Sequence, residues 1–331
     1  MKRNWMQILA VFLMGMLMPG IAMQFGQALV SARGDAQTAP ATDPTQSTQT
    51  TQVPAQTGTK LPVLMDDGSL KIMELDAYLL GVVLAEMPAS FETEALNAQA
   101  VAARTCAMQC HRDGVKHPGG AVCTQSVCCQ AYMAAGDYLS QGGTRENVDK
   151  VMGAVSETSG QVLTYEGKLI QATYFSCSGG KTEDAVAVWG TEVPYLQSVI
   201  SPGEEKAESF IAEARFSAAE FAALLGRNLK GSCASWLGST TYTEGGGVAT
   251  MAVAGKTYTG TELRKLLSLN STAFTMAAEG DTIIVTTSGR GHRVGMSQYG
   301  ADAMAVTGST YEEILAYYYP GTRIDKLHSV E

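Results

Sequence analysis

The sequence predicts an α+β fold made of two lobes with a cleft between them. Helical and strand-like patterns alternate irregularly after residue 60, and the strand-like segments are short and bounded by turns. Residues 203–279 also carry apolar helix and strand patterns of their own, enough for a small inserted lobe. We therefore expect a first lobe from 61–202 and 280–331 and a second lobe from 203–279. A single continuous domain is the alternative.

The N-terminal residues 1–30 have the pattern of a transmembrane helix. Lys2 and Arg3 precede an apolar run of about 20 residues, the length that spans a bilayer core. This basic flank places the N-terminus in the cytoplasm and the rest of the chain outside it. We expect an uncleaved, single-pass anchor in the cell membrane. A cleaved signal peptide is the alternative, because Ala28 to Ala32 offers a weak cleavage site.

Residues 31–60 are rich in Thr, Gln, Ala and Pro and contain almost no large apolar side chain. Such a segment cannot bury enough surface to offset its ordering entropy, so we expect a disordered linker. The chain as a whole carries a formal charge of −9, which argues against nucleic acid as a partner.

The periodicity of apolar residues predicts the elements of the folded part. A hairpin is expected at 61–73 around Asp66–Asp67–Gly68, and a helix at 75–87 that Pro88 stops. Ser90 is the expected N-cap of a second helix reaching Cys110. The remaining expectations are a helix at 144–157, strands at 161–165 and 168–175, helical structure in 203–238, strands in 239–287 with a helix at 261–268, and helices at 297–306 and 310–318.

Glu86 is the first candidate for chemistry. It lies in the last turn of an otherwise apolar helix, where the helix dipole and the apolar surroundings both disfavour a charged carboxylate. Both effects raise the pKa, which is what a general acid for glycosidic cleavage needs. An ordinary solvated glutamate at a helix end is the alternative.

A metal site is the second candidate. One imidazole and three thiols, from His117, Cys123, Cys128 and Cys129, fall within 13 residues, and four such ligands suit a closed tetrahedral zinc site. Disulfides or reduced core cysteines are the alternatives. His111 is a competing ligand, and Cys106 and Cys110 are reserve ligands one helical turn apart.

Two glycine-rich segments, Tyr174 to Glu183 and Gly289 to Ala301, complete the candidate site. Glycine lets a bulky ligand approach the backbone, and a glycan needs several hydrogen-bonding segments to be held in place. In the second segment, His292 and Gln298 are candidates to bind a sugar or to orient Glu86. We expect the two segments to meet at the cleft.

These segments together resemble the stage II sporulation protein D family, whose domain is called SpoIID/LytB. The matching residues are Ala85 to Phe91, Ala98 to Thr105, Tyr174 to Glu183, Trp189–Gly190, Val193 to Leu196, Gly291 to Ala301 and Tyr317 to Gly321. They occur in the family's order over most of the folded part. One departure is Arg293, where the family has glycine; it would add bulk and charge beside the presumed cleft.

The resemblance implies a peptidoglycan lytic transglycosylase that acts during sporulation engulfment, with Glu86 as its catalytic acid/base. It implies substrate-binding roles for Tyr174 and Ser178, and a structural zinc ion as in clostridial members. The expected product is a 1,6-anhydro-muramic end on peptide-stripped glycan strands. The implied partners are a cell-wall amidase and a membrane protein of the engulfment machinery.

Two other functions remain open. A hydrolase would leave reducing ends instead, and a non-catalytic protein would bind glycan and activate a partner amidase.

Overall fold

The structure is a computed structural model that describes residues 58–330. The predicted anchor, and the linker up to residue 57, lie outside the described residues. Within residues 58–330, no helix is long and apolar enough to cross a membrane. The described part mixes helices with several small sheets, so the mixed α and β character predicted from the sequence is confirmed.

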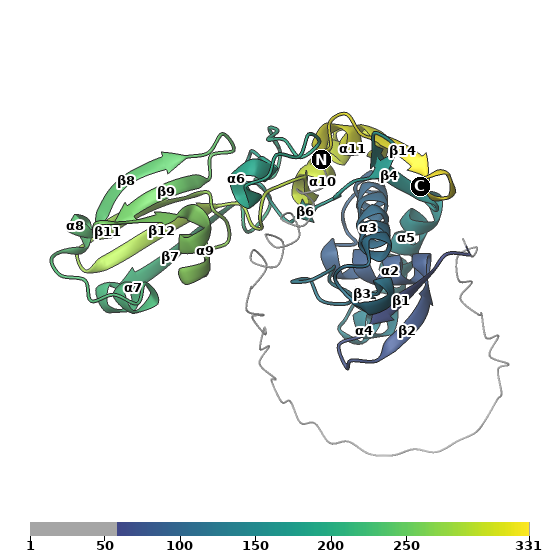
Figure 1. The fold of residues 1–331 in the computed structure, drawn as a ribbon, viewed down its shortest axis with the longest axis horizontal. Coiled ribbons are helices and arrows are strands. Elements are labelled where there is room, and N and C mark those ends of the chain that lie inside the picture. Colours follow the sequence, from purple (N-terminus) through teal and green to yellow (C-terminus); the bar gives the residue numbers. More distant parts are fainter. Residues whose placement is uncertain (1–57, 331) are drawn as a thin grey trace, which may run out of the picture.

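A long buried helix, α3 (Thr93–Asp113), lies at the centre of the first lobe (Figure 1). Its Ala-rich faces allow close packing against its neighbours, which include α2 (Leu75–Glu86) and α5 (Arg145–Glu157). The helix begins after Glu92, and not at Ser90 as predicted, because Pro88 to Phe91 forms a turn first. The other helices of this lobe are α4 (Ala135–Ser140), α6 (Ala185–Trp189), α10 (Gln298–Val306) and α11 (Tyr311–Tyr318).

Arg104 of α3 ties these helices together. Its side chain is fully buried and donates to the carbonyl groups of Thr158 and Val155 at 2.8 and 2.9 Å. It also pairs with Asp76 of α2 at 3.3 Å. A buried cation is stable only when it is paired and hydrogen-bonded, so this network fixes α2 and α5 on α3.

Two small sheets flank the helices of the first lobe. The predicted hairpin is present as β1 (Lys60–Leu64) and β2 (Leu70–Glu74), and β3 (Val122–Cys123) adds a parallel strand to β1. In the other sheet β4 lies between β14 and β5; their bounds are β4 (Gln161–Tyr165), β5 (Lys168–Leu169) and β14 (Arg323–Lys326).

The second lobe stands apart from the first in Figure 1. It has its own apolar cluster, separate from that of the first lobe. Two three-stranded antiparallel sheets enclose it, one in the order β11-β12-β7 and the other in the order β10-β9-β8. The elements are β7 (Ile211–Ser217), α7 (Ala218–Leu224), α8 (Cys233–Trp236), β8 (Leu237–Tyr242), β9 (Val248–Val253), β10 (Lys256–Thr259), α9 (Gly260–Leu266), β11 (Phe274–Glu279) and β12 (Thr282–Ser288).

Two features of this lobe differ from the sequence-based expectation. Residues 211–217 form a strand, not a helix, and their side chains alternate in burial along β7. The lobe also extends past residue 279, because β12 pairs with β7 on one side and β11 on the other. The predicted helices at 261–268 and 310–318 are present within a residue or two.

The chain passes between the lobes through two segments that lie side by side. Strand β6 (Tyr174–Phe175) pairs in parallel with β13 (Met296–Ser297). Further along, the backbones of Cys177 and Arg290 form an isolated antiparallel β-bridge. Gly179 packs so closely here that a Cβ atom would lie 2.8 Å from the backbone of Ser288 and Gly289. The two glycine-rich segments therefore meet, although more than a hundred residues separate them.

Candidate active site and metal centre

Glu86 is the last residue of α2, and its carboxyl group is largely buried. Burial raises the pKa of Glu86 from 4.5 to about 7, because the charged form loses its hydration. The backbone N–H of Ala131 donates to Oε1 of Glu86 at 2.7 Å, and this hydrogen bond lowers the pKa by a smaller amount. Among the described residues, no second carboxyl group contributes to this shift. Glu86 is thus a lone carboxyl group that both gains and loses a proton near neutral pH.

Tyr174 lies close enough to Glu86 for the two side chains to interact electrostatically. Burial, and then the charge of Glu86, raise the pKa of Tyr174, so its hydroxyl group stays protonated. That hydroxyl donates to Oε1 of Gln130 at 2.8 Å. Gln130 and Ala131 are neighbours in the chain, so one short segment contacts both Glu86 and Tyr174. Neither contact could be predicted from the sequence, because each joins residues more than 40 positions apart.

Ser178 is fully buried in this structure. Its hydroxyl and its backbone N–H donate to Oε2 of Glu204, at 2.9 and 2.7 Å. Gly179 N–H and the Cys177 thiol donate to the same oxygen, and Ser201 donates to the other one. The carboxylate of Glu204 therefore fixes the shape of the turn after β6. Glu204 was not singled out from the sequence, where Glu204–Glu205 looks like a solvated acidic loop.

His292 lies between two aromatic rings, those of Phe175 and Trp189, each with its centroid 5.5 Å away. Its Nδ1 accepts from the N–H of Val294 at 3.1 Å, and the ring also bonds to the backbone of Tyr174. Burial, followed by the charge of Arg264, lowers the pKa of His292 to about 4. The imidazole is therefore neutral at pH 7.

Gln298 begins α10 and is almost fully buried. Its side-chain amide lies 3.5 Å from that of Gln99 on α3. It thus faces the helical core of the first lobe.

Arg293 does not add charge to the cleft, as the sequence suggested, because its side chain turns inward and is only 2% exposed. Its φ of 65° is unusual for a residue with a side chain. The guanidinium donates to the carbonyls of Ser178, Lys181 and Gly245, each at 2.7 Å, and pairs with Glu183 at 3.3 Å. Because Gly245 belongs to the second lobe, Arg293 fastens the two lobes together.

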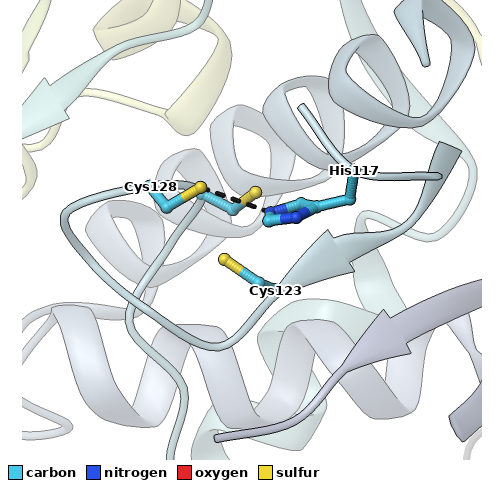
Figure 2. Close-up of side chains that lie close together, drawn as sticks. His117, Cys123 and Cys128 are labelled. Carbon is cyan, nitrogen blue, oxygen red and sulfur yellow. Dashed lines mark hydrogen bonds between the residues drawn. The ribbon is translucent and has the colours of Figure 1, made fainter. Parts of the chain in front are cut away.

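A cluster of four side chains close in sequence to Gln130 and Ala131 could hold a metal ion. The ligand atoms of His117, Cys123, Cys128 and Cys129 all lie within 4.8 Å of one another, and Figure 2 shows three of them converging. In a tetrahedral zinc site with bonds of about 2.0–2.3 Å, ligand atoms are about 3.5–3.8 Å apart. The four donors need only a small adjustment to reach that geometry.

Of the two alternatives for the cysteines, disulfides are not seen. All seven cysteines lie in the described residues, and each is a free thiol. His111 bonds through Nδ1 to the carbonyl of Gly120 and is outside the four-residue cluster. Cys106 and Cys110 are also outside it, although the Cys110 thiol contacts that of Cys129.

The metal cluster and the candidate acid are joined through the chain itself. Cys128 and Cys129 directly precede Gln130 and Ala131, the residues that contact Tyr174 and Glu86. Any group that fixes the two cysteines therefore also fixes the donor to Glu86.

Comparison with known proteins finds a family match over the region of this site. A family model described as SpoIID, stage II sporulation protein, matches residues 67–165, which include Glu86 and all four cluster residues. The chain is 43% identical over 263 residues to stage II sporulation protein D of Bacillus subtilis, covering 78% of this chain and 76% of that protein. It is 39% identical to the protein of the same name from Bacillus amyloliquefaciens, covering 79% and 77%.

A more distant relative is the amidase enhancer of Bacillus subtilis, 28% identical over 74% of this chain and 40% of that protein. The matching family model and these relatives place the chain among sporulation proteins. The chain belongs to the stage II sporulation protein D family.

Proposed function

We propose that this protein is a lytic transglycosylase that cleaves peptidoglycan glycan strands, with Glu86 as its one catalytic acid/base. The observation that carries the proposal is a lone, largely buried carboxyl group with a pKa of about 7. Ordinary glycosidases use two carboxyl groups, one of which activates water or attacks the sugar. A lytic transglycosylase needs only one, because the nucleophile is a hydroxyl group of the substrate.

In the proposed reaction, protonated Glu86 donates its proton to the glycosidic oxygen between N-acetylmuramic acid and N-acetylglucosamine. The bond from that oxygen to C1 of the muramic residue then breaks. The Glu86 carboxylate next takes the proton of the muramic C6 hydroxyl, and O6 attacks C1 to close a 1,6-anhydro ring. The proton gained restores Glu86 to its starting state, and no water is consumed.

The neighbours of Glu86 suit this cycle. The Ala131 N–H stabilises the carboxylate form during the second half of the reaction, while burial keeps the acid form available for the first half. Tyr174, held by Gln130, supplies a protonated hydroxyl group beside the carboxyl. Trp189 and the neutral His292 are partly exposed and offer an aromatic surface for a sugar face.

We also propose that the four-residue cluster binds one structural zinc ion. Three thiols and one imidazole are the donor set of closed zinc sites. When bound, such an ion would supply folding free energy to residues 117–129. The chain's own ligands, His117, Cys123, Cys128 and Cys129, would then hold residues 130–131 against Glu86.

The membrane anchor, the extracytoplasmic location, the engulfment role and a partner amidase remain part of this proposal. They rest on the N-terminal sequence pattern and on the family resemblance. The kinship to an amidase enhancer supports the second candidate function, in which the domain binds glycan and activates an amidase without cutting.

The two functions differ in whether Glu86 is needed for cleavage. Peptide-stripped glycan strands should be incubated with the full-length chain and the release of short products measured. Glu86→Gln keeps the shape but cannot transfer protons, so the rate should fall about 10²–10⁴-fold. Glu92→Gln is the matched control, since this exposed carboxyl group lies six positions further on and should not be needed. Strands left uncut by the unaltered protein would favour the activator function.

A further inference from the structure

Arg264, in the last turn of α9, is a partly buried cation with no carboxylate partner among residues 58–330. Its Nε donates a long hydrogen bond, 3.4 Å, to the carbonyl of Leu269. Four arginines of residues 58–330, namely Arg104, Arg215, Arg293 and Arg323, form ion pairs with carboxylates. In contrast, no carboxylate in that range lies within 4.0 Å of Arg264. The terminal nitrogens of its guanidinium group are open to solvent, where an anion from outside the chain can reach them.

The backbone places this cation beside the candidate active site. The N–H of Gly291 donates to the carbonyl of Asn270 at 3.0 Å, which joins the segment after α9 to the loop that carries His292. Arg264 acts electrostatically on the His292 ring, which in turn contacts Trp189 and the backbone of Tyr174. Arg264 thus brings a positive charge from the second lobe to the loop that carries His292.

The charge of Arg264 is retained at neutral pH. Burial and the nearby Arg293 lower the pKa of Arg264 to about 10, still well above 7. His292 is neutral at that pH, so Arg264 supplies a positive charge that His292 does not.

We propose that Arg264 binds the lactyl carboxylate of a muramic acid residue, and so makes the site select glycan strands whose peptides have been removed. This inference rests on the proposed glycan-cleaving function. The sugars of a glycan strand are neutral except for the lactyl group of muramic acid, whose carboxylate is free only when no peptide is attached. A guanidinium matches a carboxylate through two parallel hydrogen bonds. An attached peptide would convert that carboxylate into a neutral amide and add bulk.

A purely structural role makes a different prediction. Arg264 lies near the C-terminal end of α9, where its charge and its bond to Leu269 would stabilise the helix end. Loss of that role would lower the melting temperature but would leave glycan preference unchanged.

The test measures binding, not cleavage, by the full-length chain carrying Glu86→Gln. The two probes are peptide-stripped glycan strands and the same strands with the lactyl carboxyl converted to a neutral methylamide. We expect the charged strands to bind about tenfold tighter or more, as a charge-assisted hydrogen bond supplies. Adding Arg264→Gln should abolish the preference, and Arg264→Lys should retain part of it.

Arg215→Gln is the matched control, because it removes an exposed arginine of the same lobe that is paired with Glu213. It should leave the preference intact. Equal binding of both probes by the chain that carries only Glu86→Gln would overturn the inference about Arg264. An undiminished preference after Arg264→Gln is added would do the same. Neither result would affect the proposed function. Binding of neither probe would overturn the proposed function as well. A melting curve of each variant separates loss of fold from loss of preference.

Discussion

The backbone N–H of Ala131 donates a 2.7 Å hydrogen bond to the carboxyl group of Glu86, 45 residues earlier in the chain. Ala131 follows Cys129 by two residues, so the candidate acid and the candidate metal centre share one segment of backbone.

The rate of cleavage should fall on the alkaline side with an apparent pKa of about 7. Only the protonated form of Glu86 can donate to the glycosidic oxygen, and that form is lost as pH rises through 7. Well above pH 7 the rate should drop about tenfold per pH unit. The pH dependence of the rate on peptide-stripped strands, measured below saturation, provides the check. A rate that stays flat from pH 6 to about 9 would be inconsistent with Glu86 as the acid.

Glu86→Gln should stabilise the protein at alkaline pH. The folded state raises the pKa of this acid above its unfolded value of 4.5, so the folded state binds the proton more tightly. Its stability is therefore fully present below pH 4.5 and declines as pH rises through 7. A neutral glutamine removes that loss, by up to about 3 kcal/mol at pH 8 but by only about 1 kcal/mol at pH 5. Denaturant unfolding at both pH values tests this, and a gain of equal size at each would contradict it.

Protein purified without added metal should contain about one equivalent of zinc. Its removal by a chelator should expose the backbone at 128–131, because the ligands at Cys128 and Cys129 would no longer be held. Hydrogen exchange should then accelerate at the Ala131 N–H, while α5 serves as the unchanged reference. If the Ala131 N–H kept its full protection from hydrogen exchange in metal-free protein, the metal centre would not be what holds this donor against Glu86.

Arg293→Ala should destabilise the protein by about 3–5 kcal/mol, because it leaves Glu183 buried without its cationic partner. It should also loosen the second lobe, since the bond from Arg293 to the carbonyl of Gly245 is lost. Arg290→Ala is the control, since that neighbouring side chain is exposed. Unfolding free energies and limited proteolysis report the two effects. Equal stability of the two variants would show that the buried network does not hold the lobes.

The sequence predicted those features that depend on neighbouring residues. The apolar period of α2 and the stop at Pro88 placed Glu86 at a helix end, and close spacing brought His117 and the three cysteines together. Strand β7 was missed because its short alternation leads directly into the Ala-rich α7, so the whole stretch has a helical composition.

The features that were not predicted depend on long-range packing. Nothing in the sequence near Glu204 shows that its carboxylate accepts a hydrogen bond from the backbone N–H of Ser178. Nothing near Ala131 indicates that its N–H donates to Glu86. Arg293 was expected beside the cleft because sequence spacing does not give the direction of a side chain. Its left-handed backbone and the acceptors around it turn the guanidinium inward.

The central claim is that Glu86 alone performs both proton transfers, so that the substrate's own O6 replaces water. Mass spectrometry of the strand ends made from peptide-stripped glycan, in water labelled with ¹⁸O, tests it most directly. The account predicts 1,6-anhydro-muramic ends that carry no label, and their loss in Glu86→Gln. Reducing ends that carry ¹⁸O would contradict it, since they require an activated water molecule and a second catalytic group.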